Sequence, residues 1–129
     1  MSENLPTTIL IIDDEESLRS LLEIILEGAD FRVLVASNAD EALETLKSQE
    51  EPVRAALLDL NLNQIKGEDF YDEIVAIDPN ISVFPMSGCL PEEIEERFAN
   101  KRIAGVITKP FLPSDLLNVI EQGLSSASN

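Results

Sequence analysis

Histidine is absent from this 129-residue sequence, and cysteine occurs once, as Cys89. Without an imidazole, the chain by itself can form no Ser-His or Cys-His catalytic pair and no histidine metal site. A single cysteine allows no internal disulfide and no sulfur-rich zinc site, so we expect Cys89 to be a small apolar residue in a loop. The chemistry open to the chain therefore depends on oxygen and amine groups.

Long apolar runs and basic residues are also scarce. No run approaches the ~20 residues of a transmembrane helix, and the start MSENLPTT lacks the basic-then-apolar order of a signal peptide. We therefore expect no membrane insertion and a cytoplasmic location. The sequence has nine lysines and arginines and 25 aspartates and glutamates, which gives a formal net charge of −16. Because phosphate backbones repel such a polyanion, direct nucleic-acid binding is disfavoured.

Aliphatic runs of strand length alternate with segments that carry apolar residues at helical spacing. This alternation predicts an α/β protein in which a parallel five-stranded sheet is covered by helices on both faces. Right-handed crossovers favour a flavodoxin-like, doubly wound (βα)5 three-layer sandwich with strand order 2-1-3-4-5. We place this domain at residues 8–124, with an N-terminal extension at 1–7 and a polar tail or linker start at 125–129. The predicted strands are Thr8–Asp13, Phe31–Ala36, Arg54–Asp59, Ile81–Met86 and Ala104–Thr108.

Helix signals lie between these runs. Gly28 stands where the first helix should end. Ser37 or Asn38 could cap the second helix, with an acid three residues further on. Pro91 and Pro113 stand near the starts of the fourth and fifth helices, where a missing N–H costs nothing.

Four of the predicted strands end in polar or charged residues. The first runs from ILII into Asp13 and Asp14, and the third ends at Asp59. Ser87 follows the fourth strand and Lys109 the fifth. Because the carboxyl ends of parallel strands share the edge where ligands bind, we expect these groups to meet there. Carboxylates ~4 Å apart repel by about 1 kcal/mol in water and ~4 kcal/mol at a protein-like dielectric, so this edge should attract a positive group.

Each of these residues also has a purely structural interpretation. Asp13 or Asp14 could cap the helix that follows, and Asp59 or Ser87 could be a turn residue. A chance meeting of all four strand ends, with complementary charges, is the weaker explanation.

Five short motifs occur in order along the chain. They are DD at 13–14, LLDLNL around Asp59, Gly67, MSG around Ser87, and TKPF at 108–111. Each motif alone is weak. The ordered set, which extends from about Thr8 to Leu124, resembles the receiver domain of two-component response regulators in the CheY-like superfamily.

The resemblance implies a phosphoprotein of a two-component system or phosphorelay. Asp59 would accept a phosphoryl group from a phosphohistidine on a sensor histidine kinase or histidine phosphotransfer protein. Asp14, Asp59 and the backbone carbonyl of Asn61 would bind Mg²⁺, and Asp13 would orient a metal-bound water. This donor set suits Mg²⁺, which prefers oxygen ligands at ~2.0–2.1 Å and keeps several waters.

Further roles are implied for the remaining strand ends. Lys109 would pair with Asp59 and then with a phosphoryl oxygen, Ser87 would donate its hydroxyl to another, and the Lys109–Pro110 bond is often cis in the family. Phosphorylation would switch the surface around the fourth and fifth strands and helices for a downstream effector. Such a domain catalyses only its own phosphorylation and dephosphorylation, so we expect no classified enzyme activity.

The chain departs from the family pattern at three places. Val106 replaces the usual aromatic residue whose side chain reports phosphorylation, and stiff valine cannot move a ring. Leu62-Asn63 replaces a usual Met-Pro pair. Pro85 lies inside a predicted strand, where it removes a ladder donor, so we expect a local distortion or an N–H direction that needs no partner.

The sequence disfavours two other functions and leaves a third open. An aspartate-nucleophile phosphatase needs a second acid two residues after Asp59, where this chain has Asn61. An FMN carrier needs N–H donors after the first strand, where DDEES would repel the phosphate. The remaining alternative is a receiver-like protein-binding module that works without phosphorylation.

Overall fold

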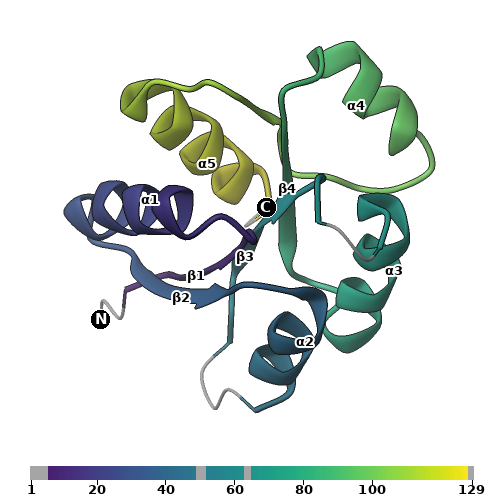
Figure 1. The fold of residues 1–129 in the computed structure, drawn as a ribbon, viewed down its shortest axis with the longest axis horizontal. Helices are drawn as coiled ribbons and strands as arrows, with labels where there is room; N and C mark the ends of the chain where they lie inside the picture. The colour runs from purple at the N-terminus through teal and green to yellow at the C-terminus, as the bar shows by residue number, and fades with distance from the viewer. Residues whose placement is uncertain (1–5, 49–51, 63–64, 128–129) are drawn as a thin grey trace.

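The computed structural model describes residues 6–48, 52–62 and 65–127. Residues 1–5 of the predicted extension, Asn63 of the divergent Leu62-Asn63 pair and residues 128–129 of the predicted tail lie outside this range. Helices and strands alternate throughout (Figure 1). In chain order they are β1 (Thr8–Ile12), α1 (Glu16–Gly28), β2 (Arg32–Ala36), α2 (Ala39–Ser48), β3 (Ala55–Asp59), α3 (Gly67–Ile77), β4 (Ser82–Ser87), α4 (Pro91–Arg97), β5 (Ile107–Thr108) and α5 (Pro113–Ala127).

The five strands form one parallel sheet in the order β2-β1-β3-β4-β5, as predicted. Helices α1 and α5 cover one face and α2, α3 and α4 the other (Figure 1). Alternate residues of β1 show the division, because Ile9 and Ile11 join the core under α1 and α5 while Leu10 and Ile12 join the opposite core. The strands β1, β3 and β4 are therefore buried on both faces, which explains their nearly continuous apolar character, whereas the edge strand β2 is partly exposed.

Local signals set most helix ends. Gly28 is the last residue of α1, and Pro91 and Pro113 are the first residues of α4 and α5. The side chain of Asn38 accepts a hydrogen bond from the N–H of Glu41 at 2.8 Å, so Asn38 caps α2. Helix α5 continues to Ala127, beyond the predicted domain end at Leu124. Within the described part of the chain, no helix has both the length and the apolar character to cross a membrane.

The prediction of a five-residue strand at Ala104–Thr108 was wrong, because β5 contains only Ile107 and Thr108. The carbonyls of Val83 and Ser87 accept hydrogen bonds from Ala104 and Lys109 at 2.9 and 2.8 Å, so these alternate β4 residues face β5. Pro85 lies between them and faces the same way, but it has no N–H to donate. The β4–β5 ladder therefore begins only at Met86, which pairs with Ile107.

Candidate functional site

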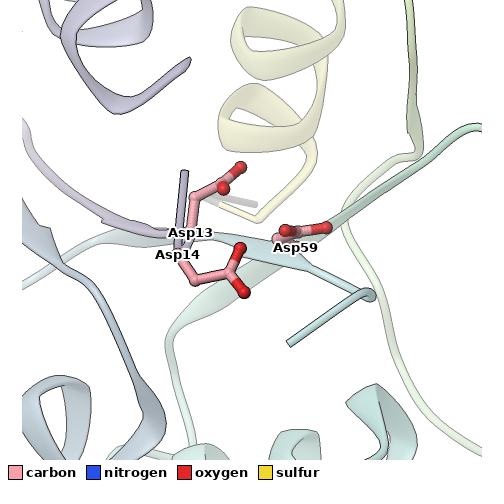
Figure 2. A group of neighbouring side chains, drawn as sticks. All are labelled: Asp13, Asp14 and Asp59. Carbon is pink, nitrogen blue, oxygen red and sulfur yellow. The ribbon is translucent and has the colours of Figure 1, made fainter. Parts of the chain in front are cut away.

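Three carboxylates meet at the carboxyl edge of the sheet. Asp13 and Asp14 directly follow β1, and Asp59 is the last residue of the neighbouring strand β3. One oxygen from each lies within 4.8 Å of the others, and Figure 2 shows the three side chains next to each other at this edge. Asp13 and Asp59 are buried, whereas Asp14 is exposed. The structure thus brings together the acids that the sequence placed at two separate strand ends.

Backbone hydrogen bonds hold the two buried acids. The N–H of Asp13 donates to the carbonyl of Ala36 at 3.1 Å, and Asp13 Oδ1 accepts from the N–H of Glu15 at 2.9 Å. Asp59 Oδ1 accepts from the N–H of Asn61 at 3.0 Å. Each acid therefore also stabilises the turn that follows it. Helix α1 itself has Glu15 at its N-cap without a side-chain cap, so Asp13 orders the loop before the helix instead of capping it.

Lys109 supplies the positive group. Its Nζ lies 3.2 Å from Asp59 Oδ1 and 3.7 Å from Asp13 Oδ2. Its N–H donates to the carbonyl of Ser87 at 2.8 Å, which attaches the end of β5 to the end of β4. The Lys109–Pro110 bond is cis, as the resemblance implied. One ammonium therefore faces two buried carboxylates.

The electrostatic balance of the site favours a further cation. Asp13 Oδ2 is buried and has no hydrogen-bond partner among the described residues. Burial raises the pKa of Asp13 above its ordinary value of 3.8, and the charge of Asp59 raises it further, while the Glu15 N–H and Lys109 act in the opposite direction. An anionic oxygen without a hydrogen bond from the described residues, beside two other carboxylates, belongs to a donor set suited to Mg²⁺, because this cation prefers oxygen ligands.

Ser87 ends β4, the strand that pairs with β3, and Asn61 follows Asp59 by two residues. Ser87 is buried at the end of β4, and its Oγ accepts a hydrogen bond from the N–H of Cys89 at 3.0 Å. Asn61 is exposed and immediately follows the Asp59 turn. Both residues thus have a turn function in addition to any contact with a ligand. Cys89 is an exposed free cysteine in the loop between β4 and α4.

Val106 immediately precedes β5. It is half-buried and packs against the core under α2, α3 and α4. Together with Phe98 and Arg102 it lines an open groove of about 520 Å³ between α4 and β5. A small side chain thus stands where the family usually has an aromatic ring.

Arg19 on α1 contacts the site although its place in the sequence did not predict this. Its Nη1 donates to the backbone carbonyl of Asp13 at 2.8 Å. The sequence does show a basic residue in the helix that directly follows the acidic run. Helical periodicity alone does not show which atom of the preceding loop this side chain reaches.

Comparisons with known proteins agree with this architecture. A family model described as "Response regulator receiver domain" matches residues 9–121. The response regulator receiver protein CpdR of Brucella abortus is 31% identical over 92% of this chain and 98% of its own length. The sensor kinase/phosphatase LuxN of Vibrio campbellii is 29% identical over 95% of this chain, which spans only 14% of LuxN. The crystal structure of a CheY-like receiver domain protein from Methanospirillum hungatei is 26% identical and superposes with a TM-score of 0.85, covering 96% of this chain and 98% of that one.

Proposed function

This chain belongs to the response regulator receiver domain family, and on that premise we propose that Asp59 is its phosphoacceptor. The donor is a phosphohistidine on a sensor histidine kinase or histidine phosphotransfer protein. An Asp59 carboxylate oxygen attacks phosphorus, the new O–P bond forms as the N–P bond of the donor breaks, and the imidazole leaves. The observation that carries the proposal is the shared position of Asp59, two further acids and one ammonium at a single sheet edge.

We assign the metal site to Asp13, Asp14, Asp59 and the backbone carbonyl of Asn61. Bound Mg²⁺ supplies charge neutralisation between the acids and the incoming phosphoryl oxygens. Lys109 Nζ lies 3.2 Å from Asp59 Oδ1, which supports the proposal that it pairs with a phosphoryl oxygen after transfer. Ser87 has its hydroxyl at the end of the next strand, where it serves as donor to another.

We infer that occupancy of Asp59 is transmitted through Lys109 and Ser87 to the surface formed by β4-α4 and β5-α5. Phosphorylation adds about −1.5 to −2 charge at neutral pH beside these donors. That charge shifts the equilibrium between two conformations of the domain because it interacts more favourably with one conformation than with the other. Since Val106 has no ring to reorient, the change at this surface is carried by the Lys109 and Ser87 loops, and a downstream effector protein or domain reads it.

The proposed receiver function also implies boundaries for the domain and a location for the protein. We place the receiver domain at residues 8–124, in the cytoplasm, where ATP-dependent kinases act. We propose no catalysis beyond the domain's own phosphorylation and dephosphorylation, and no contact with nucleic acid. The second candidate is a protein-binding module that works without phosphorylation; the turn functions of Asp59 and Ser87 are the observations that favour it.

Incubation with acetyl phosphate and Mg²⁺ tests the proposal. We expect intact-mass spectrometry to show the gain of one phosphoryl group in the wild type and none in Asp59→Asn or in EDTA. Asp30→Asn, a matched change at an exposed position far from the site, should label like the wild type. Absence of labelling in the wild type, with Mg²⁺ present and the protein folded, would favour the binding-module alternative.

A further inference from the structure

The side chain of Arg19 reaches back from helix α1 to the end of strand β1. Its Nη1 donates a 2.8 Å hydrogen bond to the carbonyl of Asp13. That carbonyl belongs to the peptide group that joins Asp13 to Asp14. A charged side chain on a helix thus holds the peptide that precedes the exposed member of the acidic cluster.

The backbone before this peptide is anchored by other contacts. The N–H of Asp13 bonds to Ala36 of β2, and the carboxylate of Asp13 accepts from the N–H of Glu15. These two bonds place Asp13 itself. Because the peptide group is planar, the hydrogen bond from Arg19 to its carbonyl oxygen also restrains the backbone nitrogen of Asp14.

Asp14 differs from the other two acids in its exposure. Asp13 and Asp59 are buried and packed from all sides, whereas Asp14 is exposed. Its carboxylate nevertheless has an oxygen within 4.8 Å of oxygens from both partners. The orientation of the peptide that carries Asp14 is one of the restraints on this position.

We propose that Arg19 is a positioning residue for the divalent cation, because it orients the 13–14 peptide so that Asp14 completes the acidic cluster. This inference rests on the proposed function, since it assigns a role within the same metal site. Arg19 acts through the peptide and does not itself touch the cation.

If Arg19 acted only through its positive charge, the expected effect on cation affinity would be the opposite. A guanidinium near three carboxylates lowers the local negative potential and should weaken cation binding. The same positive charge helps to lower the pKa of Glu41 on α2, although the N–H and hydroxyl of Ser37 are the larger causes. Removal of Arg19 therefore tightens cation binding if Arg19 acts by charge, and weakens it if Arg19 acts by geometry.

The test is the Mg²⁺ affinity of Arg19→Met, measured by isothermal titration calorimetry. Loss of a partner that orients a ligand typically costs 10–100-fold in metal affinity, so we expect Kd to rise about tenfold. Arg54→Met is the matched control, because Arg54 precedes β3 at the opposite edge of the sheet and its removal changes the net charge equally. We expect its affinity to equal or exceed that of the wild type.

Three outcomes separate the possibilities. Weaker binding in Arg19→Met with unchanged or tighter binding in Arg54→Met supports the inference. Equal or tighter binding in Arg19→Met overturns it and leaves the proposed function standing. If the wild type binds no Mg²⁺, the metal site itself fails and the inference with it. Should Arg19→Met not fold, Arg19→Lys takes its place: it keeps the charge but loses the guanidinium, so weaker binding supports the positioning role and wild-type affinity overturns it.

Discussion

The ammonium of Lys109 is shared between two buried carboxylates, at 3.2 Å from Asp59 Oδ1 and 3.7 Å from Asp13 Oδ2. Lys109 donates a hydrogen bond to Asp59 but not to Asp13. Asp13 Oδ2 therefore has no hydrogen bond from the described residues. A single lysine thus compensates two acids incompletely. The stability of the metal-free protein should depend strongly on this one side chain.

Lys109→Met should destabilise the metal-free protein by about 1–3 kcal/mol, because it leaves a buried carboxylate without its charged partner. Urea unfolding in EDTA measures the loss. Lys47→Met removes a lysine from the exposed end of α2 and should cost less than about 1 kcal/mol. Added Mg²⁺ should stabilise Lys109→Met more than the wild type, since the cation replaces the missing charge. Equal losses in the two variants would contradict the assigned role of Lys109.

Asp13→Asn should stabilise the metal-free protein at neutral pH, by on the order of 1–3 kcal/mol for relief of one buried oxygen that has no hydrogen bond from the described residues. The pKa of Asp13 is raised above 3.8 in the folded state, so the folded protein takes up this proton at a higher pH than the unfolded protein does. Asp13 therefore favours folding at low pH, and this contribution is lost as pH rises through the raised pKa.

The advantage of Asp13→Asn should thus shrink as the pH falls from neutral toward 3.8. Urea unfolding of both proteins in EDTA across this range provides the measurement, with Asp30→Asn as the exposed control. A pH-independent difference between wild type and Asp13→Asn would show that titration of this carboxyl is not the cause.

Mg²⁺ should stabilise the wild type against urea, because it binds only the assembled acidic cluster. The gain at a hundredfold excess over Kd is about 2.7 kcal/mol. Asp14→Asn removes one carboxylate of the cluster, so it should lose most of the Mg²⁺ effect. In Asp30→Asn the effect of Mg²⁺ should match that of the wild type, and an equal effect in Asp14→Asn would remove Asp14 from the metal site.

Gly123→Ala should destabilise the protein although it places alanine in a helix. A Cβ at this buried position of α5 would lie 2.5 Å from two ring carbons of Phe84 and 2.9 Å from the carbonyl oxygen of Ala104. Overpacking costs about 1–3 kcal/mol, which exceeds the gain of about 0.5–1 kcal/mol from replacing glycine by alanine in a helix.

Gly28→Ala is the matched control for this prediction. Gly28 also lies in a helix, but a Cβ there meets no atom within 4 Å, so only the propensity gain applies. We expect thermal unfolding to show a lower Tm for Gly123→Ala and an equal or higher Tm for Gly28→Ala. A higher Tm for both variants would mean that the Phe84 ring moves away from the new Cβ without a loss of stability.

Much of the fold could be predicted from the sequence because its signals are local. Strand-length apolar runs and helical spacing determine which segments pair and which cover them. The strand order followed because crossover handedness and parallel pairing leave few arrangements. Glycine and proline marked helix ends correctly at Gly28, Pro91 and Pro113, since their backbone limits act within a few residues.

The length of β5 could not be predicted in this way. Pro85 is visible in the sequence, but its effect depends on which neighbour its missing N–H faces. Alternation along β4 directs it toward β5, where the ladder consequently starts late. The period of the apolar residues at 104–108 contains no information about that direction.

The sequence by itself determined the membership of the acidic site, because each acid ends a strand whose place in the sheet follows from its apolar pattern. Only the tertiary structure decided that Asp13 and Asp59 are buried while Asp14 is exposed, and that Arg19 reaches the peptide between Asp13 and Asp14. The physical reason is that strand ends are set by local composition, whereas burial and side-chain reach depend on how α1 and α5 pack against the sheet.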